Sequence, residues 1–86
     1  MKASQTLAHL APGEKAIVER LEVQGDMRRR FLDLGLIEKT KIECIGKSSW
    51  GDPAAYLIRG AVIAIRSKDS AGILIRKIGK EDAPWD

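Results

Sequence analysis

Histidine and cysteine, the residues most often used as catalytic bases, nucleophiles and ligands of transition metals, are scarce in this sequence. The 86 residues include one histidine, His9, and one cysteine, Cys44. A nucleophilic cysteine needs a base within hydrogen-bond reach, and a metal site needs several convergent ligands. We therefore interpret His9 as an ordinary surface or hydrogen-bonded residue and Cys44 as a small core residue. With no glycine-rich phosphate-binding motif either, we predict no catalytic, cofactor-binding or metal-binding residue, and hence no enzyme.

A run of three arginines is the first feature suited to binding a partner. Arg28, Arg29 and Arg30 are consecutive, and on a helix they spread over about 200°, so they cannot all face one phosphate backbone. One interpretation is a solvated helix face with local ion pairs such as Arg29 with Asp33. The other is contact with an acidic protein surface, for which Arg29 and Arg30 are the candidates.

Apolar and aromatic side chains supply the remaining candidates for partner binding. Trp50 lies in a turn-rich stretch, Ser48–Pro53, where it either anchors an interface or caps the core locally. Asp52 precedes a proline and is more suited to setting the turn than to binding a metal. In a thin barrel some apolar strand residues must face outward, and the candidates for that role are Tyr56, Ile58 and Leu74.

Composition limits the class of protein. The chain is 44% hydrophobic and 31% charged, as expected of one small globular domain, and its net charge of +3 is scattered along the sequence. Phosphate binding is typically accompanied by a concentrated basic stripe, so this charge does not by itself predict nucleic-acid binding. One cysteine, no long apolar run and no signal-type segment indicate a cytoplasmic protein.

Hydrophobic periodicity predicts one helix among short strands. Met27, Phe31 and Leu34 share one helix face, Asp26 suits the helix start, and Gly35 is expected to end it in a left-handed conformation. From Thr40 onward the period changes to two, with alternation that places Cys44 in the core. The predicted elements are a helical turn 6–10, a strand 14–21, a helix 24–34, a strand from 40, strands 54–59 and 61–66 separated only by Gly60, a turn 67–71 capped by Ser67, and a strand 73–75.

These elements predict an all-β fold, a small closed β-barrel with one inserted short α-helix. Closure would remove the exposed edges that an open five-stranded sheet leaves. We expect the domain to span residues 1–78 and residues 79–86 to form a flexible C-terminal tail.

The ordered motifs resemble a known family. They are Thr6-Leu7-x-x-Leu10-x-Pro12-Gly13-Glu14, Arg30-Phe31-Leu32-Asp33-Leu34-Gly35-Leu36, Gly51-Asp52-Pro53, Arg59-Gly60, Ile65-Arg66, and Ala71 before Ile73. Together they are similar to the ferrous iron transport protein A family (FeoA), with Glu38-Lys39-Thr40 and Trp50 as departures from its pattern. The resemblance implies an SH3-like barrel.

The resemblance also implies a function. It points to a small cytosolic partner of FeoB, the bacterial ferrous iron permease with a cytosolic GTPase domain, which this protein would bind and modulate. Such a protein would be peripheral to the membrane only through its partner, and an apolar patch on so small a barrel could support weak self-association.

Two other functions remain open at this stage. A mildly basic small barrel could bind nucleic acid, although scattered charge and few aromatic residues disfavour it. Direct binding of ferrous ion would use carboxylates such as Glu43, Asp52 or Asp69 with His9, and these are scattered in the sequence.

Overall fold

The structure is a computed structural model that describes residues 5–78, and it is a six-stranded antiparallel sheet with one α-helix of more than two turns. The predicted tail, residues 79–86, lies outside the described residues. The elements are β1 (Gln5–Thr6), the 3-10 turn η1 (Leu7–His9), β2 (Lys15–Leu21), α1 (Gly25–Asp33), β3 (Lys41–Lys47), β4 (Ala54–Ile58), β5 (Ala61–Ile65), α2 (Ser67–Ser70) and β6 (Ile73–Ile78).

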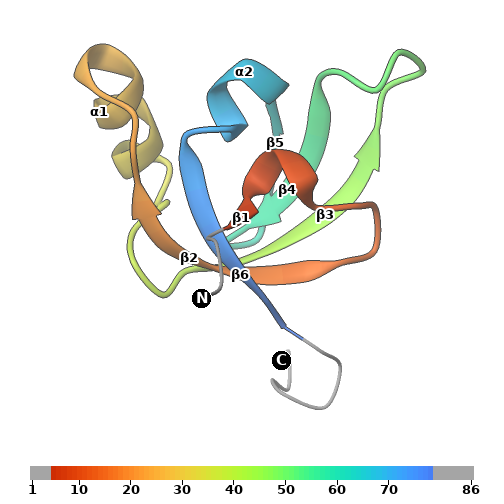
Figure 1. Ribbon diagram of the computed structural model, residues 1–86, viewed down its shortest axis with the longest axis horizontal. Helices are drawn as coiled ribbons and strands as arrows, with labels where there is room; N and C mark the ends of the chain where they lie inside the picture. Colours follow the sequence, from red (N-terminus) through yellow and green to blue (C-terminus); the bar gives the residue numbers. More distant parts are fainter. Residues whose placement is uncertain (1–4, 79–86) are drawn as a thin grey trace.

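The sheet coils into a small SH3-like barrel (Figure 1). Its strand order is β1-β6-β2-β3-β4-β5, so β1 and β5 are edge strands. The predicted all-β barrel with one inserted short α-helix is confirmed, but its expected closure is wrong, because no pairing joins β5 to β1 within residues 5–78. Strand β1 was not predicted from the sequence; it has only two residues and pairs Gln5 with Ile75 and Thr6 with Leu74.

The inward faces of the strands form one apolar core. In β3, Ile42 and Cys44 are fully buried while Lys41 is exposed, as the alternation predicted. Leu7, the first residue of η1, and Leu10, the residue directly after it, are also fully buried. The core therefore draws on the N-terminal turn as well as on the strands.

Helix α1 connects β2 to β3 and packs one face on the barrel. Phe31 is buried, and Met27 and Leu34 pack against the same core cluster, which confirms the predicted helix face. The helix ends as expected, because Gly35 adopts a φ of 95° that only glycine tolerates without strain. No ion pair between Arg29 and Asp33 forms among the described residues.

Two turns differ from the sequence predictions. Gly60 does not separate β4 from β5 alone: Arg59 and Gly60, with φ of 51° and 83°, make a two-residue hairpin turn with the primed geometry that suits twisted strands. Ser67 does not cap α2 either, because it is the first helical residue and the N-cap position belongs to Arg66. The cap is supplied by Asp52 instead, whose carboxylate accepts hydrogen bonds from the Ser67 backbone N–H at 2.8 Å and hydroxyl at 3.2 Å.

Candidate partner-binding surface

The outer side of α1 borders an apolar groove. We call it the α1 groove; it is a hollow of about 480 Å³ lined by Arg20, Leu21, Arg28, Leu32, Leu36, Ile37 and Glu38. Helix α1 supplies one wall, the end of β2 the opposite wall, and the loop after α1 the floor. Leu36 is fully buried, whereas Leu32 and Ile37 are 40% and 46% exposed. Two large apolar side chains that line one hollow are thus in reach of solvent, which is typical of a protein contact surface.

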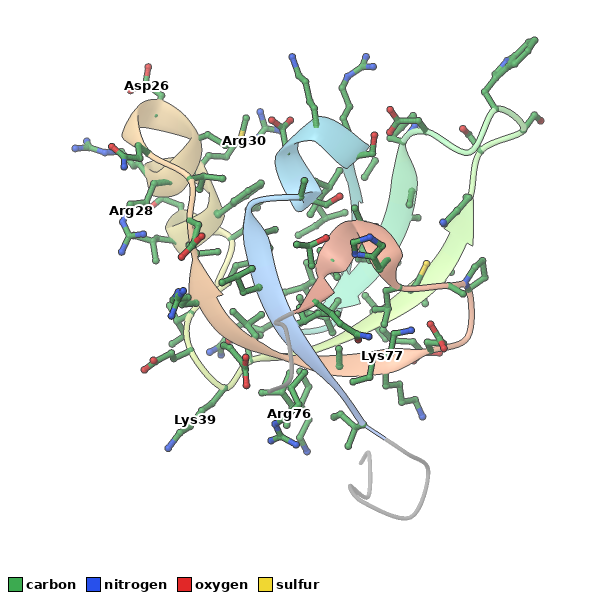
Figure 2. The ribbon with its side chains drawn as sticks, viewed as in Figure 1. Asp26, Arg28, Arg30, Lys39, Arg76 and Lys77 are labelled. Atoms are coloured by element: carbon green, nitrogen blue, oxygen red, sulfur yellow. The ribbon has the colours of Figure 1, made fainter. Side chains whose placement is uncertain are left out.

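Arginines border the α1 groove. Arg28 donates from Nη1 to the backbone oxygen of Leu21 at 3.3 Å, which ties the guanidinium to the opposite wall. Figure 2 shows Arg28 pointing outward from α1. Arg29 and Leu32 line a second, shallow hollow of about 270 Å³ that also contacts Arg28. An apolar strip edged by two arginines fits an acidic, amphipathic partner, since long arginine stems cover apolar surface while their charges stay hydrated.

The structure separates the two predicted arginines. Arg29 is exposed and borders Leu32, whereas Arg30 lies on another side of the helix and lines a hollow shared with β5 and the start of α2. In Figure 2 Arg30 points from α1 towards α2, away from Arg28. The two side chains therefore serve different surfaces.

Trp50 is the most exposed large apolar side chain of the described residues, at 93%. This exposure rules out the interpretation that it caps the core locally. It lies in the loop between β3 and β4, which Figure 1 places at the opposite side of the molecule from α1. Trp50 and the α1 groove are consequently separate surfaces, although a large partner could contact both.

Three of the predicted partner-binding residues are buried, and the expected outward orientation is wrong for two of them, Tyr56 and Ile58. Tyr56 and Ile58 are 2% and 1% exposed because both lie on the inward face of β4, opposite Cys44 and Ile42 of β3. Leu74 is 9% exposed and lies in a groove between the outer sides of β2 and β6. Tyr56 also donates its hydroxyl to the backbone oxygen of Leu7 at 3.4 Å, and burial raises its pKa. Its role is in the core.

Asp52 has a structural role in the fold. Both of its carboxylate oxygens accept hydrogen bonds from Ser67, so the residue joins the β3–β4 loop to α2. This agrees with the expectation that it shapes the turn, although Asp52 also remains exposed to solvent.

The carboxylates considered for a metal site are not gathered. Within residues 5–78 no group of three or more His, Cys, Asp or Glu side chains is placed to hold a metal ion. His9 instead contacts the Thr6 hydroxyl, with 3.1 Å between Nδ1 and Oγ1. Cys44 is fully buried, and that burial raises the pKa of its thiol. The direct ferrous-ion hypothesis therefore gains no support from the described residues.

Leu32 and Ile37 are exposed apolar residues that were not predicted from the sequence. Leu32 follows Phe31 directly, so a helix places it about 100° away from the core-facing side chains. An apolar residue off the core face is a readable signal. Ile37 carried no comparable signal, because its exposure depends on the path of the loop between α1 and β3.

The architecture and this surface together define a class of protein: an SH3-like β-barrel with one inserted helix and exposed apolar sites suited to protein contacts. Residues 5–77 match the model of the FeoA domain, so this chain belongs to the FeoA domain family. No helix in the part of the chain that the structure describes has the length and apolarity to cross a membrane.

Individual relatives agree with this assignment. The chain is 29% identical over 72 residues to the Fe(2+) transport protein A/Fe(2+) transporter FeoB fusion protein of Porphyromonas gingivalis, which covers 84% of this chain and 8% of that much longer relative. It is similar to the solution structure of a FeoA-like protein from Clostridium acetobutylicum, with a TM-score of 0.83, 26% identity and 93% of each chain covered.

A third relative supports the fold. The crystal structure of Stenotrophomonas maltophilia FeoA in complex with zinc, described as an SH3 domain protein, matches with a TM-score of 0.76 and 20% identity, covering 84% of this chain and 89% of that one.

Proposed function

We propose that this protein is a small cytosolic accessory protein of bacterial ferrous iron uptake that binds the cytosolic part of FeoB and modulates its activity. The observation that carries the proposal is the Porphyromonas gingivalis relative, in which a transport protein A and a FeoB transporter are fused. Fusion holds two domains at a high effective concentration. Contact between two such domains needs a surface that supplies affinity.

The α1 groove is the surface best suited to that task. Leu32 and Ile37 offer apolar area next to the buried Leu36, and central apolar contacts provide most of the affinity in protein interfaces. Arg28 and Arg29 at its border would pair with carboxylates of the partner and raise the rate of association. Trp50 is a second contact, on the far side of the barrel.

The test is binding of the purified protein to FeoB in detergent and to its soluble cytosolic fragment. Leu32→Asp places a charge in the groove, and Arg28→Glu reverses the charge at its border; each is expected to weaken binding by about tenfold or more. Trp50→Ala is expected to weaken binding to a FeoB region large enough to reach both surfaces. GTP hydrolysis by FeoB, measured with and without saturating wild-type protein, tests modulation.

Matched controls exclude general effects of charge. Ile45→Asp introduces the same acid at a side chain that is 47% exposed, close to the 40% of Leu32, on β3 rather than α1. Lys68→Glu reverses a charge on α2. Both controls should bind like wild type. Absence of binding by the wild-type protein contradicts the proposed function, and equal losses in the controls contradict the α1 groove as the contact.

A further inference from the structure

Strand β5 is an open edge of the barrel. It pairs with β4 on one side and with no other strand of residues 5–78 on the other. Val62 is 64% exposed and Ala64 is exposed as well, so neither is covered by a neighbouring element. An exposed edge strand presents unpaired backbone groups that can accept a further strand.

The hairpin geometry identifies which backbone groups are free. Ile58 and Ala61 flank the two-residue turn and are directly paired, so they form a hydrogen-bonded pair. Hydrogen-bonded and non-hydrogen-bonded pairs alternate along an antiparallel ladder, which leaves Ile63 bonded to β4. The N–H and C=O groups of Val62 and Ala64 therefore point away from β4. No hydrogen bond from another part of the described chain reaches them.

This edge also lacks the usual protection. Natural edge strands are shielded by charged residues, proline, bulges or a covering element. The segment Ala61–Ile65 has the sequence Ala-Val-Ile-Ala-Ile, with no charge, no proline and no bulge against β4. The backbone N–H and C=O groups of Val62 and Ala64 are therefore available for hydrogen bonds on a regular strand of high β-propensity.

A hollow beside this edge has room for a side chain. It measures about 140 Å³ and lies between α1 and β5, with Phe31 and Leu34 on one side and Ile63 and Ile65 on the other. Apolar cavities near this size, about 150 Å³, accept a molecule as large as benzene. A residue of an added strand lying beside Ile63 would point to the same face of the sheet and into this hollow.

Charge around the hollow and the strand ends is mainly positive. Arg30 and Arg66 line the hollow together with a single acid, Asp69, and Arg59 stands at the other end of β5. We propose that the β5 edge binds an extended segment of a partner protein by strand addition, with a branched apolar side chain of that segment in the hollow and acidic residues beside it facing the arginines. The segment that we propose for the β5 edge is different from the part of FeoB that we propose to contact the α1 groove.

A second copy of this chain fits the edge less well. In a two-fold antiparallel pairing centred on Ile63, Val62 of one copy would lie opposite Ala64 of the other. That register brings Arg66 of each copy opposite Gly60 and beside Arg59 of its neighbour, which places like charges together. An acidic segment meets the same backbone groups without that repulsion.

The experiment uses the full chain and five blocked synthetic peptides, Glu-Thr-Xaa-Thr-Glu, in which Xaa is Leu, Ile, Val, Met or Phe. Amide exchange and NMR shifts are measured for each residue, with binding constants from titration. We expect at least one peptide to bind and to slow exchange of the Val62 and Ala64 amides by about tenfold or more. No binding by any of the five, or binding that leaves both amides unchanged, overturns the proposal.

Backbone and charge controls sharpen the test. Val62→Pro removes an outward N–H without removing a bond to β4 and is expected to weaken peptide binding about tenfold. Val62→Thr keeps the backbone N–H and should bind the peptide like wild type. If Val62→Pro fails to fold, a peptide can be used in which the backbone nitrogens of the two Thr residues, which would bond to β5, are methylated. This peptide should not bind the wild-type protein. Lysine-ended peptides should bind Arg30→Glu/Arg66→Glu better than wild type, while Arg76→Glu, a charge reversal on the exposed side of β6, behaves like wild type. Unchanged binding of the N-methylated peptide overturns strand addition.

The outcome is separable from that of the proposed function. The peptides are tested without FeoB, and the α1 groove variants leave the β5 edge intact. If the free protein instead forms a dimer in which the Val62 and Ala64 amides are already protected, a second copy occupies the edge and the partner segment proposed here is wrong.

Discussion

The Asp52 carboxylate accepts two hydrogen bonds from Ser67, one from its backbone N–H at 2.8 Å and one from its hydroxyl at 3.2 Å. Ser67 begins α2, where backbone N–H groups have no partner within the helix. An acid fifteen positions earlier in the sequence therefore performs the task that an N-cap residue usually performs. The same contact fixes the loop that carries Trp50 against α2.

Replacing Asp52 should destabilise the protein by as much as the loss of a helix N-cap usually does. Asp52→Ala is expected to lower the free energy of unfolding by about 1 kcal/mol, and Asp52→Asn, which keeps an acceptor, by less. Ser67→Ala removes only the hydroxyl bond and provides the matched comparison. Chemical denaturation of the three variants checks the order. A stability of Asp52→Ala equal to that of wild type would show that the contact adds nothing.

Gly35 should be intolerant of a side chain for two reasons. Its φ is 95°, and a Cβ at this position would lie 2.5 Å from Cδ of Arg59. Arg59 also donates from Nε to the Gly35 oxygen at 3.2 Å. Gly35→Ala therefore adds backbone strain and displaces Arg59, so we expect a loss of about 2 kcal/mol in the free energy of unfolding.

Gly13 provides a control for Gly35, because a side chain at Gly13 would cause backbone strain without a steric clash. Its φ is 89°, but a Cβ there would meet nothing within 4 Å. Gly13→Ala should cost about 1 kcal/mol, less than Gly35→Ala. In an Arg59→Ala background the difference between the two glycine variants should largely disappear. If it persists, the Arg59 contact is not its cause.

Local sequence patterns predicted the elements of this fold well. The spacing of Met27, Phe31 and Leu34 placed the helix face on the core, and Gly35 placed the helix end. Alternation after Thr40 placed Cys44 inside. These signals succeed because each depends on neighbours within one or two turns, or within one strand.

The surface was less predictable because it depends on contacts between distant segments. Alternation shows that Tyr56 and Ile58 share a face of β4, but not which face is inside; their pairing with Cys44 and Ile42 decides that. The open β5 edge likewise follows from which strands pair, which no local motif specifies. Ile37 is exposed for a similar reason, since the loop path sets its position.

Glu14 should make stability depend on pH. Its carboxylate accepts a hydrogen bond from the Ala11 backbone N–H at 2.7 Å and pairs with Lys77 at 3.2 Å, and these contacts lower its pKa from 4.5. A depressed pKa in the folded state gives stability that is present above 4.5 and is lost as the pH falls through the folded value. Glu14→Gln should remove the part of the decrease in stability at acidic pH that is due to this carboxylate. Thermal unfolding from neutral to acidic pH checks it, and parallel curves for variant and wild type contradict it.

Cys44 should be nearly inert in the native protein. It is fully buried, its thiol lies 3.9 Å from the Gly46 backbone oxygen, and burial raises its pKa, so both access and the thiolate fraction are reduced. Reaction with an aromatic disulfide reagent should therefore be slower than in concentrated guanidinium chloride by about a thousandfold, with the rate set by unfolding. Asp52→Ala, which lowers stability, should raise the native rate in proportion. Rapid native labelling that does not respond to Asp52→Ala would mean that the β3 core opens locally, without global unfolding.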